Sequence, residues 1–157
     1  MQNLDKIDRN ILKVLQKNGR VTYADIARQV GLSTTPCLER VKKMEKQGVI
    51  RGYTTIVNPE YLKANLVVFI NIRLSKQEQD VFAKFKAAVL KLTTVQECYL
   101  VSGNFDYLLK ARVKDMSSYR KFYAETVLKL PGVIECTSHV VMEEVKDTME
   151  IHTEAGF

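Results

Sequence analysis

Residues 23–42 of the chain are YADIARQVGLSTTPCLERVK, and this stretch predicts the fold of the N-terminal part. Thr22, with an acidic residue three positions later, is typical of the residue that caps the start of a helix. Gly31 then supplies the positive φ of a tight turn, and Pro36 suits the first turn of the next helix. Ala27 is small enough to let two helices cross closely. The stretch therefore predicts a helix-turn-helix, which is a pair of helices joined by a short turn.

Helical and extended patterns flank this motif. Hydrophobic residues recur at helical spacing over residues 4–17, which predicts a helix that Asn18-Gly19 ends. The second helix of the motif is predicted over residues 35–47. Residues 50–57 alternate loosely between apolar and polar side chains, which predicts a strand or a hairpin arm.

The second half of the chain alternates between strand and helix patterns. We place the domain boundary after residue 60, so that the two domains are residues 1–60 and 61–157. Strands are predicted over residues 66–74, 95–101, 107–113 and 133–142. Amphipathic helices follow the first and the third of these strands. The order β-α-β-β-α-β is typical of a ferredoxin-like fold, and the whole chain is predicted to be of the α+β class.

An internal repeat supports this order. Residues 89–98 (VLKLTTVQEC) recur 38 residues later as residues 127–136 (VLKLPGVIEC), with seven of ten positions identical. Both copies fall where a helix ends and a strand begins, as expected for a duplicated unit. In the usual strand order of this fold, Cys98 and Cys136 lie at opposite edges of the sheet, which argues against a disulfide bond between them.

Charge and composition narrow the class of protein. The first 60 residues hold 11 Lys and Arg against 6 Asp and Glu, which favours contact with a polyanion. The longest apolar run, residues 66–70, is far shorter than a membrane span, and the N-terminus lacks the pattern of a secretion signal. Three cysteines without C-x-x-C spacing disfavour a disulfide framework and a zinc site. We therefore expect a cytoplasmic protein that binds neither a metal nor a membrane.

The second helix of the motif is predicted to have an apolar and a polar side. The apolar side, which is expected to contact the core, consists of Cys37, Leu38, Val41 and Met44. The N-terminal residues of a recognition helix enter the major groove of DNA, so base contacts are predicted there and phosphate contacts further along. The predicted base contacts are Thr34, Thr35, Glu39 and Arg40, and the predicted phosphate contacts are Lys42, Lys43 and Lys46. Arg40 can donate two hydrogen bonds to guanine. The alternatives are an ion pair of Glu39 with Lys43 and a solvated Arg40.

Several stretches of the chain together resemble the Lrp/AsnC family of transcriptional regulators. They are LDKIDRNILKVLQKNGR, IARQVGLSTTPCLERVKKMEKQGVIRGY, ECYLVSGNFDYLLKARVKDMSSYRKF, LPGV and VVMEEVK, between residues 4 and 146. The resemblance implies a winged helix-turn-helix that binds double-stranded DNA and a ligand-sensing domain that dimerises through its sheet. It also implies rings of dimers, with an octamer as the expected size, and an amino-acid effector such as leucine bound where dimers meet. Members of the family regulate genes of amino-acid metabolism.

The resemblance further implies an effector pocket around the loop between the second and third strands of the second domain. The last strand is expected to approach the same pocket. The implied effector-binding residues are Val101, Gly103, Asn104, Phe105, Asp106, Thr137, Ser138 and His139. Asp106 is the expected partner of an ammonium group. Gly103 and Asn104 can also be explained as turn formers that need no ligand. The family commonly has an acid where Asn104 stands, and its closest members have Tyr where His139 stands.

Two other classes of function compete with a DNA-binding regulator. An enzyme is disfavoured, because the chain has only two histidines and no nucleophile elbow, and because Glu143 and Glu144 point to opposite faces of a strand. The other class is an amino-acid-sensing scaffold without specific DNA binding. A steep loss of DNA affinity with rising salt distinguishes a DNA-binding protein from such a scaffold.

Overall fold

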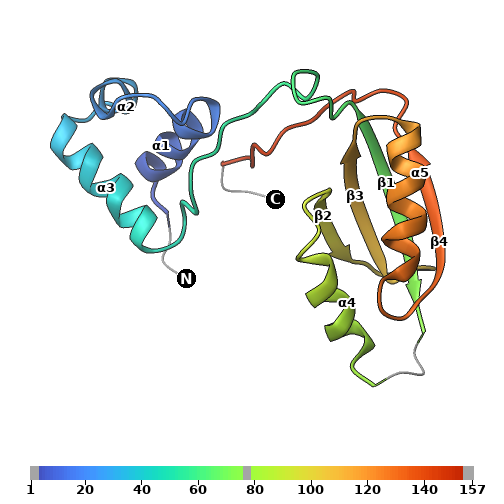
Figure 1. Ribbon diagram of the computed structural model, residues 1–157. Helices are drawn as coiled ribbons and strands as arrows, with labels where there is room; N and C mark the ends of the chain where they lie inside the picture. Colours follow the sequence, from blue (N-terminus) through green and yellow to red (C-terminus); the bar gives the residue numbers. More distant parts are fainter. Residues whose placement is uncertain (1–3, 76–78, 154–157) are drawn as a thin grey trace. The chain divides into compact units, whose positions relative to one another are not determined.

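The computed structural model describes residues 4–75 and 79–153 of the chain. The chain forms two compact units (Figure 1). The N-terminal unit reaches to Ile56 and includes the tail that starts at Lys146, and the C-terminal unit spans Val57–Val145. This division differs from the predicted one mainly in the tail, which groups with the first unit and not with the second.

The described residues of the N-terminal unit form three helices: α1 (Lys6–Lys17), α2 (Tyr23–Val30) and α3 (Thr34–Lys46). Thr22 caps α2, because its hydroxyl oxygen accepts a hydrogen bond from the Asp25 N–H at 3.1 Å. Gly31 ends α2 with a φ of 74°, in the left-handed region that glycine adopts without steric penalty. The predicted helix-turn-helix is confirmed.

One side of each of these helices forms the core of the N-terminal unit. The fully buried residues of this core are Ile11, Ile26, Ala27, Cys37, Val41 and Met44. Three of the four residues predicted for the apolar side of α3 are among them. Leu38 is only half-buried and lies outside this cluster. The reason is geometric, since Leu38 stands about 100° around the helix from Cys37 and so lies at the edge of the buried side.

Residues 51–58 form no strand, so the prediction of a strand over residues 50–57 is wrong. An alternating segment becomes a strand only where a neighbouring strand pairs with its backbone groups. The sheet of the described chain includes no strand from this segment. Ile56 is consequently 92% exposed.

The C-terminal tail is held against α1 by hydrogen bonds to its backbone. The Gln16 side chain donates to the Ile151 carbonyl at 2.9 Å and accepts from the Ile151 N–H at 2.7 Å. Arg9 Nη1 donates to the Thr153 carbonyl at 3.2 Å. These bonds use backbone groups of the tail. The side-chain pattern of the tail therefore does not predict the contact with α1.

The C-terminal unit is a four-stranded antiparallel sheet with both of its longer helices packed on one face (Figure 1). In chain order its elements are β1 (Leu66–Leu74), α4 (Val81–Val89), β2 (Val95–Leu100), β3 (Tyr107–Val113), α5 (Met116–Glu125), a 3-10 turn (Val127–Lys129) and β4 (Val133–Val140). The strand order is β2-β3-β1-β4, which confirms the ferredoxin-like fold. Cys98 on β2 and Cys136 on β4 lie at opposite edges, as predicted.

Side chains of β1 alternate between the two faces of the sheet. The even-numbered residues from Val68 to Leu74 are buried in the core that α4 and α5 share. Asn71 and Arg73 point to the other face, where the register of β1 with β4 places Thr137 and Glu135 beside them. The face without helices therefore gathers polar side chains from both strands.

Tyr107 is buried in this core, and its hydroxyl group has no hydrogen-bond partner among the described residues. Its ring packs on Phe85, with the ring centroids 4.6 Å apart, and burial raises its pKa. We expect Tyr107→Phe to increase the free energy of unfolding by about 1 kcal/mol, because the change removes an unpaired buried donor and keeps the ring. Urea denaturation measures this difference. Tyr119→Phe is the control, since the Tyr119 hydroxyl is bonded to Ser138 and its removal should destabilise the protein. A comparable loss in both variants would contradict the prediction.

Candidate DNA-binding surface and effector pocket

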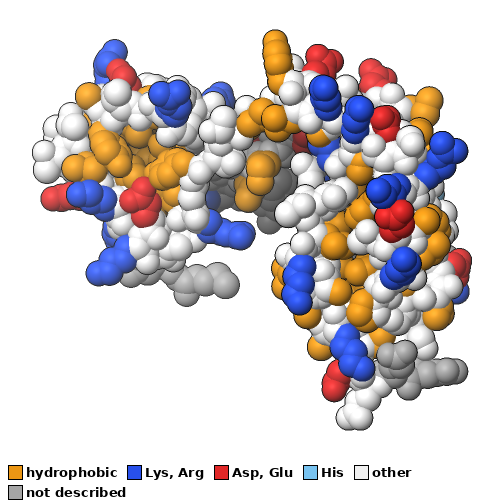
Figure 2. All heavy atoms as spheres, viewed as in Figure 1, with side chains coloured by type: hydrophobic (Ala, Val, Ile, Leu, Met, Phe, Trp, Pro, Cys, Tyr) orange, Lys and Arg blue, Asp and Glu red, His pale blue; other side chains and the backbone are white. Residues whose placement is uncertain are grey.

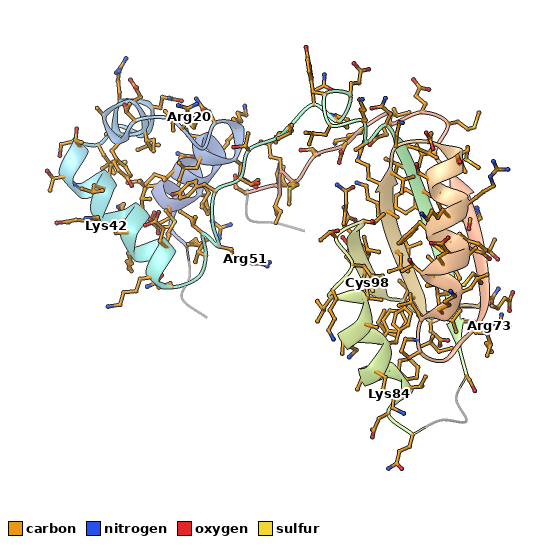
Figure 3. All side chains as sticks on the ribbon, in the orientation of Figure 1. Arg20, Lys42, Arg51, Arg73, Lys84 and Cys98 are labelled. Carbon is orange, nitrogen blue, oxygen red and sulfur yellow. The ribbon has the colours of Figure 1, made fainter. Side chains whose placement is uncertain are left out.

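The side of α3 that faces away from the core is polar and exposed. Its exposed residues include Thr34, Thr35, Glu39, Lys42, Lys43 and Lys46. Lys42 points away from the three-helix core (Figure 3). Lys and Arg side chains stand out around this unit on the face drawn in Figure 2. In the described part of the chain, Glu39 and Lys43 form no ion pair with each other. The helix thus presents cations and short polar side chains, as a recognition helix requires.

Arg40 differs from the other residues predicted to contact DNA. Its Nη1 atom donates to Asp5 Oδ2 at 2.6 Å and to Asp8 Oδ1 at 2.7 Å. Hydrogen bonds to Asp5, which has the larger effect, and to Asp8 raise the pKa of Arg40. The Asp8 backbone N–H and the Arg40 side chain together lower the pKa of Asp5. The Nη1 atom of Arg40 is therefore bound by two carboxylates at the start of α1, and the Arg40 side chain is not fully solvated. Helical spacing cannot reveal this contact, because both acids belong to another helix.

The loop between β2 and β3 is held to β1 by Asp106. Asp106 Oδ2 accepts a hydrogen bond from the Leu74 N–H at 2.8 Å. The Asp106 N–H donates to the Ile72 carbonyl at 2.8 Å, and the Val101 N–H donates to the Asp106 carbonyl at 3.0 Å. One of the two carboxylate oxygens of Asp106, Oδ2, therefore supports the fold of the loop. The predicted contact with an ammonium group would use the other oxygen.

Arg73 on β1 joins this loop to β4, and the residue patterns of the sequence do not identify it. Arg73 Nε and Nη2 donate to the Asn104 carbonyl at 3.1 and 2.7 Å. Arg73 Nη1 lies 2.9 Å from Glu135 Oε2 in an ion pair. A guanidinium, a carboxylate and a backbone carbonyl therefore meet on the helix-free face of the sheet, beside the predicted effector loop.

Two adjacent hollows share Arg73, Asn104 and Phe105. The smaller hollow, about 260 Å³, is lined by Asn71, Arg73, Asn104, Phe105, Glu135 and Thr137. The larger, about 390 Å³, is lined by Arg73, Leu74, Ser75, Gly103, Asn104, Phe105, Asp106 and Ile134. Ligand pockets typically span roughly 300 to 1,000 Å³, so one hollow lies just below this range and the other near its lower end, as suits a small molecule.

The structure separates the remaining residues predicted for the effector pocket. Ser138 lies on the opposite face of the sheet, where its hydroxyl is bonded to Tyr119 on α5, so grouping it with Thr137 does not agree with the structure. The physical reason is that successive side chains of a strand point to opposite faces. His139 shares the face of Thr137, and its Nε2 lies 3.3 Å from Asn71 Nδ2 at the rim of the smaller hollow. Val101 closes the loop through its backbone and lines neither hollow.

A helix-turn-helix with a cationic exposed helix, followed by a βαββαβ unit with polar hollows, defines a class of DNA-binding regulators that sense a small ligand. Comparison with known families agrees with this class. Residues 4–51 match the winged helix-turn-helix DNA-binding family, and residues 67–151 match the Lrp/AsnC ligand binding domain. The chain belongs to the Lrp/AsnC family of transcriptional regulators, and its N-terminal unit is a helix-turn-helix DNA-binding domain.

Relatives of known name support this assignment. The chain is 58% identical to the leucine-responsive regulatory protein of Salmonella typhimurium and 57% identical to that of Escherichia coli, over 94% of this chain and 90% of each relative. It is similar to a solved transcriptional regulator of Neisseria meningitidis in complex with L-Met, with a TM-score of 0.91, 38% identity and coverage of 95% of this chain and 96% of that one. An AsnC family regulator from Agrobacterium tumefaciens gives a TM-score of 0.89 and 36% identity over 94% of this chain and 96% of that one. These names favour a regulator over an enzyme or a scaffold.

Two features typical of other protein classes are absent from the part of the chain that the structure describes. Over residues 4–75 and 79–153, no helix is long and apolar enough to cross a membrane. Within the same ranges, no three His, Cys, Asp or Glu side chains lie close enough together to hold a metal ion.

Proposed function

We propose that this protein controls genes of amino-acid metabolism and that a small amino acid, such as leucine, changes its action on DNA. The observation that carries the proposal is the exposed cationic side of α3, opposite the buried Cys37, Val41 and Met44. Two relatives are named leucine-responsive regulatory proteins, and a structural relative was solved with L-Met. These names support an amino-acid effector.

Within the proposed DNA surface, Thr34, Thr35 and Glu39 contact base edges in the major groove. They occupy the N-terminal half of α3, which enters the groove in this motif. The Glu39 carboxylate accepts a hydrogen bond from the amino group of cytosine. Cations further along the same side bind phosphates and supply affinity that does not depend on sequence. These cations are Lys42, Lys43 and Lys46.

The proposed effector site is the pair of hollows beside Arg73. The Arg73 guanidinium binds the carboxylate of the amino acid, because Nη1 and Nη2 each carry a second hydrogen beyond their contacts with Glu135 and Asn104. Glu135 and the second carboxylate oxygen of Asp106 face the ammonium group. Phe105 and Ile134 line the larger hollow and contact an apolar side chain. Gly103 and Asn104 shape the wall between the two hollows.

Further copies of the chain complete the proposed assembly. We propose that two copies meet through the helix-free face of the sheet, that dimers form an octamer, and that the protein works in the cytoplasm. The register of the strands places Phe69, Tyr99 and Leu108 on this face, opposite the side that α4 and α5 cover. A second copy would remove these three side chains from water, which favours association.

A gel shift on the DNA upstream of the protein's own gene tests the proposed function. We expect a specific complex whose amount or mobility changes with leucine or methionine and does not change with lysine. An unrelated duplex of the same length is the control. Equal affinity for both duplexes would contradict specific binding, and a complex indifferent to leucine and methionine would contradict the proposed effector.

The phosphate contact of Lys42 has a measurable effect on the salt dependence of binding. We expect Lys42→Ala to reduce the slope of log affinity against log salt by about one, and to weaken binding to every duplex alike. Fluorescence anisotropy between about 50 and 200 mM salt measures the slope. Lys84 on α4 is also an exposed cation but lies outside the proposed surface, so Lys84→Ala is the control (Figure 3). An unchanged slope in Lys42→Ala would exclude the contact.

A further inference from the structure

Asp5 and Asp8 form a reciprocal cap at the start of α1. Asp5 Oδ1 accepts a hydrogen bond from the Asp8 N–H at 2.8 Å, and Asp8 Oδ2 accepts one from the Asp5 N–H at 3.3 Å. Each carboxylate thus uses one of its two oxygens for the cap. Both side chains are fixed in place by backbone groups, and their charges lie at the positive end of the helix dipole.

The remaining oxygen of each carboxylate accepts a hydrogen bond from Arg40. A single nitrogen, Nη1, donates to Asp5 Oδ2 at 2.6 Å and to Asp8 Oδ1 at 2.7 Å. Such short distances are typical of hydrogen bonds between charged groups. The Asp8 side chain is 16% exposed and the Arg40 side chain 32% exposed, so the contact is partly shielded from water. The recognition helix α3 is thereby joined to the start of α1.

Arg40 stands at the edge of the buried side of α3. Counting along the helix, it lies about 60° from Cys37, whose side chain is fully buried. Hydrophobic packing is not directional, so the core alone permits small rotations of α3 about its own axis. Two directional bonds at the edge of the helix oppose such a rotation. The rotation matters because it determines whether Thr35 and Glu39 face the DNA.

We infer that Arg40 is a positioning residue, which fixes the rotation of α3 through Asp5 and Asp8 and does not contact a base. The inference rests on the DNA-binding function of α3. A base contact through Nη1 would require this nitrogen to leave both carboxylates. Two uncompensated acids would then remain beside the recognition helix, where they repel the phosphates of DNA. This role replaces the guanine contact that helical spacing predicts for Arg40.

Variants of the full-length chain test this role: Arg40→Ala, Arg40→Lys and the double variant Asp5→Asn with Asp8→Asn. The readout is the ratio of the affinity for an operator, selected by the wild-type protein from a random pool, to the affinity for an unrelated duplex. We expect Arg40→Ala and the double variant each to lower this ratio about tenfold, which corresponds to the loss of one hydrogen bond to a charged group. Operators with single base-pair changes show where discrimination is lost. In both variants we expect the loss of discrimination to be spread over all positions of the operator.

The double variant separates positioning from general electrostatics. It removes two negative charges, which by itself strengthens binding to any duplex, and asparagine still caps a helix. A lower ratio in this variant therefore reports the lost contact with Arg40. A double variant with the wild-type ratio would overturn the inference, and so would a loss of discrimination confined to a single base pair in Arg40→Ala.

Two further variants serve as controls. Arg40→Lys should keep most of the ratio, because one nitrogen makes both bonds and a lysine ammonium can donate to both carboxylates. Arg28→Ala removes an exposed ion pair with Asp25 on α2 and should leave the ratio unchanged. Circular dichroism reports the helix content of each variant. Should Arg40→Ala lose helical signal, the lysine variant and the double variant decide between the two roles.

Discussion

Arg73→Ala is expected to weaken the binding of leucine or methionine about a hundredfold and to leave operator affinity without effector unchanged. Arg73 is the guanidinium that lines both hollows of the C-terminal unit. Two hydrogen bonds from it to an effector carboxylate contribute about 3 kcal/mol together, which corresponds to this factor. Isothermal titration calorimetry measures the affinity, and a gel shift with effector reports the lost response. An amino-acid affinity equal to that of the wild type would exclude Arg73 from the site.

The internal repeat supplies a matched control on the same sheet. Glu97 and Glu135 hold equivalent positions in the two copies, and each pairs with a cation of the neighbouring strand. Glu97 lies 3.3 Å from Lys110, and Glu135 lies 2.9 Å from Arg73. Of the two acids, Glu135 lines the smaller hollow and Glu97 lines neither. Glu135→Gln should therefore weaken amino-acid binding about tenfold, and Glu97→Gln should not. A similar loss in both would indicate a general effect on the sheet.

Local patterns predict the elements that the chain stabilises with its own core. Alternation predicts β1 and β3 with their observed bounds, residues 66–74 and 107–113, because one face of each strand is buried under α4 and α5. The same alternation over residues 50–57 predicts a strand that is absent. The difference is not in the segment itself but in the lack of a pairing strand in the described chain, and a local pattern cannot supply that information.

The candidate effector site is predictable only where its residues are contiguous. Gly103 and Asp106 lie in one loop, so the resemblance to the family indicates them together. Arg73 and Glu135 meet only through the register of β1 against β4, which residue spacing does not encode. The repeat gives one indication of Glu135, because Glu97 and Glu135 hold equivalent positions in its two copies. In the structure each of these acids pairs with a cation. Because successive side chains of a strand point to opposite faces, the sequence alone is sufficient to place Ser138 on the face opposite Thr137 and His139.

Gly132→Ala is expected to lower the free energy of unfolding of the C-terminal unit by about 3 kcal/mol. Gly132 has a φ of 72°, and a Cβ atom added there would overlap Cγ2 of Val81. Val81 is 2% exposed, and its β-branched side chain has little freedom to rotate away. The Gly132 carbonyl also accepts a hydrogen bond from the Ser75 N–H at 2.8 Å, which resists movement of the backbone. Urea denaturation followed by circular dichroism measures the loss.

Two more variants separate backbone strain from steric overlap. Gly48 also has a φ of 72°, but nothing lies within 4 Å of a Cβ atom added to it. Gly48→Ala is therefore expected to destabilise its own unit by about 1 kcal/mol, which is the strain alone. Val81→Ala removes the overlapping methyl group, so combining it with Gly132→Ala should destabilise less than the sum of the two single losses. Strictly additive losses would show that the two side chains do not meet.

The requirement for glycine at this position comes from its positive φ and from the packing of α4, and not from the repeated unit. The first copy of the repeat has Thr94 at the position equivalent to Gly132, and its helix still leads into a strand, β2. In the second copy, Val81 at the start of α4 occupies the space that a side chain would need. Because Gly132 directly precedes β4, which carries Glu135 and Thr137, relief of the overlap would displace one wall of the smaller hollow. Gly132→Ala is therefore expected to weaken amino-acid binding as well as folding, whereas Gly48→Ala should leave amino-acid binding unchanged.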